Sequence, residues 1–206
     1  MSDLLSLSVI LIVFTSLVSY YALNNYSTFE KASFRPYRIR YNREWWRWVT
    51  NGFIHIDYMH LFVNMLSLYF FGRNLELYLG AIVPGLAPAA FLLFYISAIA
   101  VSGIYSYLRH KNDFSYSAVG ASGAVSAVIF SCIMFDPFSK IYLYFALGIP
   151  SWIFGILYLY YEYYMGKKQM DNIGHDAHFS GAVYGLVFTI ILYPQSVIAF
   201  IGHFIR

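Results

Sequence analysis

Apolar stretches long enough to cross a membrane divide the chain. Five segments contain no Asp, Glu, Lys or Arg, and each reaches about 20 residues, the length that a helix needs to cross the hydrocarbon of a bilayer. These segments are residues 4–29, 77–108, 114–135, 141–161 and 179–205. A sixth segment, 58–79, is also largely apolar but includes polar side chains, which we expect to face other helices rather than lipid.

This pattern predicts an all-α membrane protein with six transmembrane helices. We expect helices at about residues 4–25, 58–79, 84–108, 118–135, 141–164 and 177–201, and an interfacial first loop over 30–57. The composition agrees, because 60% of the residues are hydrophobic and only 11% are charged, against roughly 25% in a soluble domain. Six helices in 206 residues leave space for a single domain over residues 1–206 and for no separate soluble one.

Basic and aromatic side chains are concentrated in the first loop. The basic ones are Lys31, Arg35, Arg38, Arg40, Arg43 and Arg47, and Tyr37, Tyr41, Trp45, Trp46 and Trp48 lie among them. In a chain this apolar, we interpret the loop as lying at the bilayer surface with its arginines reaching lipid phosphates, and we expect no nucleic acid to bind. Loops one, three and five hold ten of the thirteen Lys and Arg residues, so the positive-inside rule alone would make them cytoplasmic.

The second expected helix carries a polar stripe. His60 and Asn64 are four residues apart and share one helical face, on which Asp57 and Ser67 also lie. One interpretation is hydrogen bonding between helices, the common role of polar side chains in membrane helices. The other is that the imidazole and the carboxamide stabilise an oxyanion in a site of low dielectric constant, an effect worth about 3–4 kcal/mol per donor.

Ser122 lies between Gly120 and Gly123 near the start of the fourth expected helix. The first amides of a helix have no internal acceptor, and the helix dipole is positive at that end. A negative charge developing near Ser122 would therefore meet backbone donors. The alternative is a packing face of small residues, with Ser122 bonded to its own helix.

The sixth expected helix supplies a possible base. Ala177, Gly181 and Gly185 repeat every four residues and predict a groove into which a neighbouring helix packs closely. His178 lies at the edge of this groove and would face the fourth helix, where desolvation would keep its imidazole neutral and able to take a proton from Ser122. We expect Asp176 to cap the helix rather than to complete a triad.

These blocks, in this order, resemble the rhomboid family of intramembrane serine proteases. The matching residues are Trp46, Arg47, His55, His60, Asn64, Gly72, Glu76, Gly120, Ser122, Gly123, Ala177, His178, Gly181 and Gly185, and the resemblance covers roughly residues 43–193. It implies a six-transmembrane-helix, rhomboid-like bundle whose amino terminus lies in the cytoplasm. It also implies that Ser122 is the nucleophile, that His178 is the general base, and that His60, Asn64 and the Ser122 amide form the oxyanion hole. In several rhomboids a tyrosine four residues after the serine stacks on the histidine, whereas this chain has Ser126, which leaves open what orients His178.

The resemblance implies a multi-pass protein of the cell membrane that works as an intramembrane serine endopeptidase. Its substrates would be single-span transmembrane proteins, cleaved in their membrane segments near the outer face, with small residues at the cut and helix-weakening residues beyond it. The substrate helix would first have to unwind, because a continuous helix hides its carbonyls in its own hydrogen bonds. The resemblance implies no metal and no organic cofactor. The sequence leaves the physiological substrate, the cleavage position and the oligomeric state open.

Three other functions stay open at this point. A catalytically silent rhomboid-like protein could bind membrane clients with the same fold. A haem or metal protein could use His55, His60, His175 and His178 as ligands, although this leaves Ser122 without a role. A small transporter could also use polar groups within the membrane.

Overall fold

The computed structural model describes residues 6–143, 146–168 and 173–205. The helices are α1 (Leu7–Leu23), α2 (Tyr26–Ala32), α3 (Pro36–Asn42), α4 (Arg47–Thr50), η2 (Asn51–Phe53), α5 (Tyr58–Ser67), η3 (Leu68–Gly72), α6 (Arg73–Ile82), α7 (Ala87–Ser102), α8 (Ile104–His110), α9 (Ser122–Phe135), α10 (Ser151–Lys168), α11 (His175–Leu192) and α12 (Gln195–Ile205). The strands β1 (Lys140–Leu143) and β2 (Leu147–Pro150) pair as an antiparallel hairpin, with Lys140 opposite Pro150 and Leu143 opposite Leu147. The described residues are thus mostly helical.

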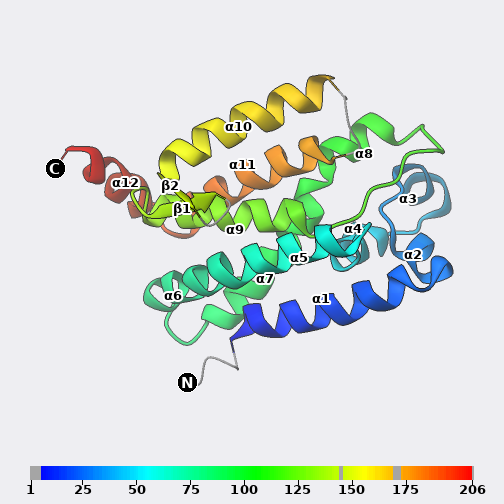
Figure 1. Cartoon of the computed structure of the whole chain (residues 1–206), viewed down its shortest axis with the longest axis horizontal. Coiled ribbons are helices and arrows are strands. Elements are labelled where there is room, and N and C mark those ends of the chain that lie inside the picture. Colours follow the sequence, from blue (N-terminus) through cyan, green and yellow to red (C-terminus); the bar gives the residue numbers. More distant parts are fainter. Residues whose placement is uncertain (1–5, 144–145, 169–172, 206) are drawn as a thin grey trace.

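Helix α9 forms the centre of the bundle. Eleven of its fourteen residues are buried, and it contacts α5, α6, α7, α10, α11 and α12. Figure 1 shows α10 and α11 on one side of α9 and α5 and α1 on the other. At 1.5 Å per residue α9 is about 21 Å long, shorter than the roughly 30 Å of hydrocarbon in a bilayer. Because other helices surround α9, most of its residues are buried within the bundle.

Glycines allow α11 to lie directly against α9. A Cβ atom at Gly181 would collide with the backbone carbonyl of Gly123, and one at Gly185 would collide with the carbonyl of Ala127. One turn further along, Thr189 Oγ1 and Ser131 Oγ are 2.6 Å apart. The two helices therefore run in parallel at close range, and the first turn of α11 lies beside the first turn of α9.

Among the polar residues of segment 58–79, Glu76 faces protein as expected, whereas Asn74 is exposed. The carboxylate of Glu76 in α6 accepts hydrogen bonds from the amides of Leu7 (3.1 Å) and Ser8 (2.5 Å) at the start of α1. These amides belong to the first turn, where a helix has no internal acceptors, so Glu76 satisfies groups that would otherwise be unpaired. Helix α5 continues into α6 through one π-helical turn, η3.

The first loop folds around a buried arginine. Arg47 is 1% exposed, and its guanidinium donates to Glu44 Oε2 (2.5 Å) and to the carbonyls of Glu30 (2.6 Å) and Ser33 (2.7 Å). The expectation that the loop arginines reach lipid phosphates is therefore wrong for Arg47. Trp45 and Trp46 remain exposed at 58% and 53%.

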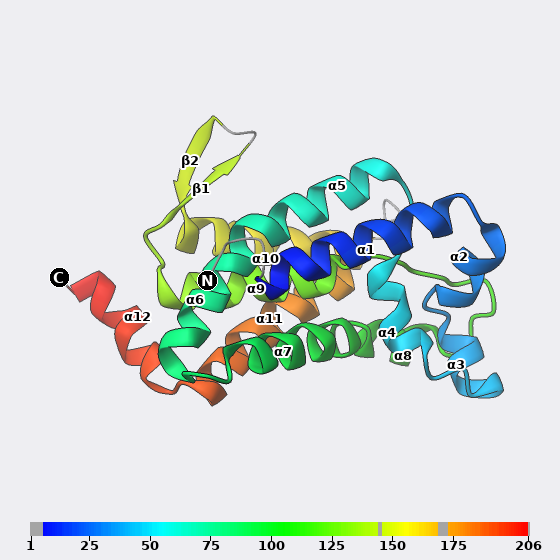
Figure 2. The same cartoon turned by 90° about the horizontal axis from the view of Figure 1, so that it is seen from below.

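Three expected helix boundaries are corrected by the structure. The helix expected at 141–164 begins only at Ser151, because Pro150 cannot donate an amide to a helix and the residues before it form the hairpin, which projects from the bundle in Figure 2. The helix expected at 177–201 is broken near Pro194 into α11 and α12, which meet at 106°. The helix expected at 118–135 begins at Ser122, because Gly120 has φ of +128° and Ala118 pairs with Phe34 in an isolated bridge.

Helix length by itself does not establish six crossings. Among the described residues, only the α7–α8 stretch Ala87–His110 is long and apolar enough to cross a membrane as one helix. The bent pair α11 and α12 would add a second crossing if it counts as one span. Helices α1 and α9 are apolar but shorter.

Candidate active site

Ser122 and His178 meet at the ends of two adjacent helices. Ser122 is the first residue of α9 and His178 lies in the first turn of α11, and the distance between Ser122 Oγ and His178 Nε2 is 2.7 Å. Both residues are partly buried. Serine and histidine at this distance have the geometry in which an imidazole can accept the hydroxyl proton and activate the oxygen as a nucleophile.

The segment before Ser122 is held in a non-helical conformation. The amide of Gly120 donates to the Asn51 carbonyl (3.0 Å), and the backbones of Ala118 and Phe34 exchange two hydrogen bonds (2.9 and 3.0 Å). A side chain at Gly120 would meet the His60 ring at 2.7 Å, and its φ of +128° is one that residues with a Cβ rarely adopt. Glycine at this position therefore lets the His60 ring lie against the backbone just before Ser122.

His55 also holds the segment before Ser122 in place. The Ser19 hydroxyl donates to the Phe53 carbonyl (3.0 Å), so its oxygen accepts from His55 Nδ1 (2.8 Å). The other ring nitrogen, Nε2, then accepts from the Ala121 amide (3.3 Å). The buried imidazole thus links α1 to the residue immediately before Ser122, and its uses in this network were not foreseen from the sequence.

The two residues expected to form the oxyanion hole lie on α5 as one polar stripe. The His60 ring is next to Gly120, two residues before Ser122. The Asn64 side chain is buried and donates from Nδ2 to the His60 carbonyl of its own helix (2.9 Å). A carboxamide has two donor hydrogens, so this bond does not exclude a second acceptor. His60 therefore lies at the site, whereas the hydrogen bond of Asn64 is internal to α5.

Glu162 of α10 lies at the site but was not predicted from the sequence as a site residue. It is 4% exposed, and its carboxylate lies 3.2 Å from His178 Nδ1 and 2.5 Å from His175 Nδ1. One signal for it was present, since it is a lone acidic residue in an apolar, aromatic segment, and ionisable residues in such segments mark functional sites. Four residues earlier on α10, the Tyr158 hydroxyl bonds to Ser126 Oγ (2.6 Å).

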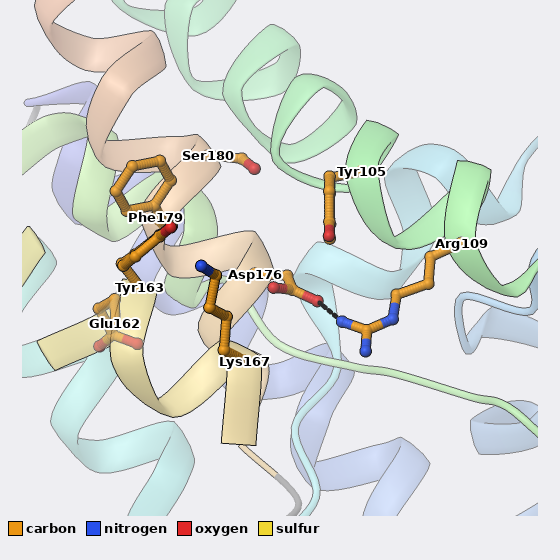
Figure 3. Close-up of a pocket in the computed structure, with 9 residues that line it drawn as sticks. Tyr105, Arg109, Glu162, Tyr163, Lys167, Asp176, Phe179 and Ser180 are labelled. Atoms are coloured by element: carbon orange, nitrogen blue, oxygen red, sulfur yellow. Dashed lines mark hydrogen bonds and ion pairs between the residues drawn. The ribbon is translucent and has the colours of Figure 1, made fainter. Parts of the chain in front are cut away.

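Asp176 does not have the expected role as a helix cap. The cap position of α11 is Gly174, and Asp176 pairs with Arg109 of α8 at 3.2 Å. The pair lines a cavity of about 350 Å³ between α8, α10 and α11, with Lys167 and Ser180 also on its wall (Figure 3). Glu162 also lines this cavity, whereas Ser122 is not among its lining residues.

The four histidines proposed as metal ligands separate into two pairs. His55 and His60 are neighbours, with ring centroids 5.0 Å apart, and so are His175 and His178, at 6.2 Å. His55 uses both ring nitrogens in hydrogen bonds and offers no lone pair to a metal. Glu162, His175 and His178 have ligand atoms within 4.8 Å of one another, close enough to hold a cation.

Comparison with known proteins identifies the family. The sequence profile of the Rhomboid domain matches residues 42–195. RHOMBOID-like protein 12, mitochondrial, of Arabidopsis thaliana is 31% identical over 144 residues, which cover 65% of this chain and 42% of that protein. Putative rhomboid protease YdcA of Bacillus subtilis is 37% identical over 84 residues, 41% of this chain and 38% of that protein. Rhomboid protease GlpG of Haemophilus influenzae is 24% identical over 161 residues, 72% of this chain and 70% of that protein.

The chain spans less than half the length of the first two of these relatives, and over two thirds of the third. The domain match runs from the first loop to the break between α11 and α12, and so includes both Ser122 and His178. Since the match covers most of the chain, the protein belongs to the rhomboid family.

Proposed function

We propose that this protein is an intramembrane serine endopeptidase in which Ser122 is the nucleophile and His178 the general base. The observation that carries the proposal is the 2.7 Å distance between Ser122 Oγ and His178 Nε2 at the start of α9. Membership of a family that includes named rhomboid proteases supports the same activity. A silent binding protein would have no need for this pair.

The reaction would proceed through an acyl-enzyme. Ser122 Oγ attacks the substrate carbonyl carbon while its proton moves to His178 Nε2, and the carbonyl oxygen becomes an oxyanion. The first amides of α9, with His60 and Asn64 of α5, are the donors that we propose for that oxyanion. His178 then gives its proton to the leaving amine, and a water molecule hydrolyses the ester.

We further propose that the bundle crosses the membrane six times. The crossings would be α1, α5 with α6, α7 with α8, α9, α10 and α11. Large apolar side chains on the outer surfaces support this arrangement, for example Leu17 (66% exposed) on α1, Tyr160 (67%) on α10 and Ile191 (75%) on α11. The substrates would be single-span membrane proteins, which reach the site through lipid and unwind before cleavage.

Cleavage in reconstituted vesicles tests the function. Purified protein would be mixed in proteoliposomes with a single-span substrate that contains helix-weakening glycines in its membrane segment. The native chain is expected to release a defined fragment, Ser122→Ala is expected to release none, and His178→Ala is expected to keep only a small residual activity. Ser115→Ala is the matched control, because Ser115 is exposed in the loop that leads to α9 and its amide and hydroxyl donate to Asp113. Equal cleavage by the native chain and Ser122→Ala would refute the proposal.

A further inference from the structure

A line of hydrogen-bonding groups continues beyond the serine and the histidine. It runs from Ser122 Oγ to His178 Nε2 (2.7 Å), from His178 Nδ1 to Glu162 Oε1 (3.2 Å), and from Glu162 Oε2 to His175 Nδ1 (2.5 Å). Three different helices contribute to it. Each of the two carboxylate oxygens has its own imidazole partner.

Glu162 is an unusual residue for its position. A carboxylate inside an apolar helix loses the hydration that stabilises its charge, and such residues are kept only where they are paired or where they act. Its side chain is 5% exposed and faces α11 rather than lipid. Packing does not explain it, since an apolar side chain of similar volume would fill the same space without that cost.

The neighbouring positions of α10 place this carboxylate. Tyr158, Glu162 and Gly166 are spaced four residues apart and so lie on one face of the helix. Tyr158 bonds to Ser126 of α9, and a Cβ at Gly166 would lie 2.8 Å from Asp176 Oδ1 of α11. The face of α10 that bears Glu162 is therefore fixed against both α9 and α11, on either side of the carboxylate.

We propose that Glu162 is the positioning residue of a Ser122–His178–Glu162 triad, a role that rests on the proposed protease function. The ionised carboxylate accepts the Nδ1 hydrogen of His178, which leaves the lone pair of Nε2 directed at Ser122. When Nε2 takes the Ser122 proton, the negative charge of Glu162 stabilises the imidazolium, and Glu162 itself gains no proton.

His175 completes the arrangement by holding the second carboxylate oxygen. Its Nδ1 hydrogen donates to Oε2, so Glu162 cannot rotate away from His178 without losing a buried hydrogen bond. In this chain the orientation of the base thus comes from α10, because residue 126 of α9 is a serine and not a tyrosine that could stack on His178.

Steady-state kinetics of the full chain in proteoliposomes test the role of Glu162. Glu162→Gln keeps the shape of the side chain but removes its charge, and kcat is expected to fall by about 10²- to 10⁴-fold with KM changed by less than about threefold. Glu162→Asp, which restores the charge on a shorter arm, is expected to recover part of kcat. Tyr160→Phe is the matched control on α10, because Tyr160 is 67% exposed, and its kcat is expected within about threefold of native.

A double mutant separates positioning from folding. In the His178→Ala background, Glu162→Gln is expected to cause no further loss of residual activity, because the carboxylate acts through His178. A further large loss would show a general structural role and overturn the proposal. Native activity that is abolished by EDTA and restored by Zn²⁺ would also overturn it, because these three side chains would then hold a cation.

Two outcomes distinguish this inference from the proposed function. Unchanged kcat in Glu162→Gln, with Ser122→Ala inactive, would refute the triad and leave the protease assignment in place. Full activity of Ser122→Ala would refute both. If Glu162→Gln fails to fold, ¹⁵N-histidine NMR of the native chain tests whether Glu162 accepts the Nδ1 hydrogen of His178. Neutral His178 is expected to carry its proton on Nδ1. A proton on Nε2 would contradict the role of Glu162.

Discussion

At the scale of single residues, the position of Ser122 depends on side chains that take no part in the chemistry. His55 is buried, and its ring nitrogens form hydrogen bonds with Ser19 of α1 and with the Ala121 amide. The ring therefore connects α1 to the turn immediately before Ser122 through hydrogen bonds. Removing it would leave a buried amide without an acceptor.

His55→Ala is expected to destabilise the protein by about 1–3 kcal/mol, the cost of a buried donor left unsatisfied. Cleavage should also slow, because the turn before Ser122 loses one of its supports. Thermal unfolding in detergent and initial cleavage rates measure the two effects. Ser19→Ala removes only the distal hydrogen bond and should have the smaller effect on both. An unchanged unfolding midpoint in His55→Ala would refute the structural role of His55 in connecting α1 to this turn.

Residue types and their spacing were enough to predict that Ser122 and His178 meet, but not what surrounds them. The small residues at 177, 181 and 185 indicated the close helix pair in advance. Glu162 was not predicted, because one acidic residue at the end of an apolar run has no local pattern that reveals its distant partners. Arg47 was misread for a similar reason, since nothing in a basic, aromatic loop shows which arginine turns inward.

At the scale of elements, the α9–α11 contact controls the distance between serine and histidine. Gly181 and Gly185 lie directly on backbone carbonyls of α9, so any side chain there must push the helices apart. The first turns of both helices carry the reacting groups, and they would separate with the rest of the contact.

Gly185→Ala is expected to lower cleavage by about 100-fold or more, as a misplacement near 1 Å of catalytic groups commonly does. Gly202→Ala on α12 is the matched control, because nothing lies within 4 Å of a Cβ built there, and its activity should stay native. Rates for both variants at equal amounts of folded protein measure the effect. Native activity in Gly185→Ala would show that the helix spacing does not set the reaction geometry.

The ion pair between Arg47 and Glu44 stabilises the fold of the first loop. Burial alone would raise the pKa of the Glu44 carboxyl. The hydrogen bond and the charge of Arg47 outweigh this effect and hold that pKa below its ordinary value. A carboxyl with a lowered pKa in the folded state stabilises the fold at pH values above its unfolded pKa, and this stabilisation is lost as the pH falls through the folded pKa.

Glu44→Gln is therefore expected to lower the unfolding midpoint at neutral pH and to flatten its decline under acid conditions. Unfolding midpoints measured in detergent between neutral and acid pH check this. Asn42→Ala is a control, because Asn42 contacts the same carboxylate more weakly, at 3.4 Å, and is uncharged. Identical acid profiles for Glu44→Gln and the native chain would contradict the linkage.

Element boundaries were the part of the fold that the sequence predicted least well. Apolar content alone cannot separate a helix from a hairpin over 141–150, where aromatic and β-branched residues also suit a strand. Pro150 and Pro194 each mark a true boundary, but no charged residue interrupts the largely apolar sequence at either one.

At the scale of the whole molecule, the two ends of the bundle differ. Figure 1 places α2, α3 and α8 at one end, and α6, the hairpin and α12 at the other. Six crossings would put these ends on opposite faces of a membrane. The interfacial aromatic and basic residues of the first loop would then all lie at one face.

Single cysteines in a Cys132→Ala background test this arrangement, because Cys132 is the only native cysteine and is buried. Tyr26→Cys and Lys111→Cys are expected to react with an impermeant thiol reagent from one side of sealed vesicles. Leu86→Cys and Ser139→Cys are expected to react only from the other side. Labelling of positions 26 and 86 from the same side would contradict six crossings.

Covalent labelling of the purified protein with a fluorophosphonate, followed by mass spectrometry of the modified peptide, tests directly whether Ser122 is the nucleophile. One adduct on Ser122 is expected in the native chain, none in Ser122→Ala and little in His178→Ala. Labelling of Ser122→Ala at the native level, or an adduct on another serine, would show that the hydroxyl at the start of α9 is not the nucleophile.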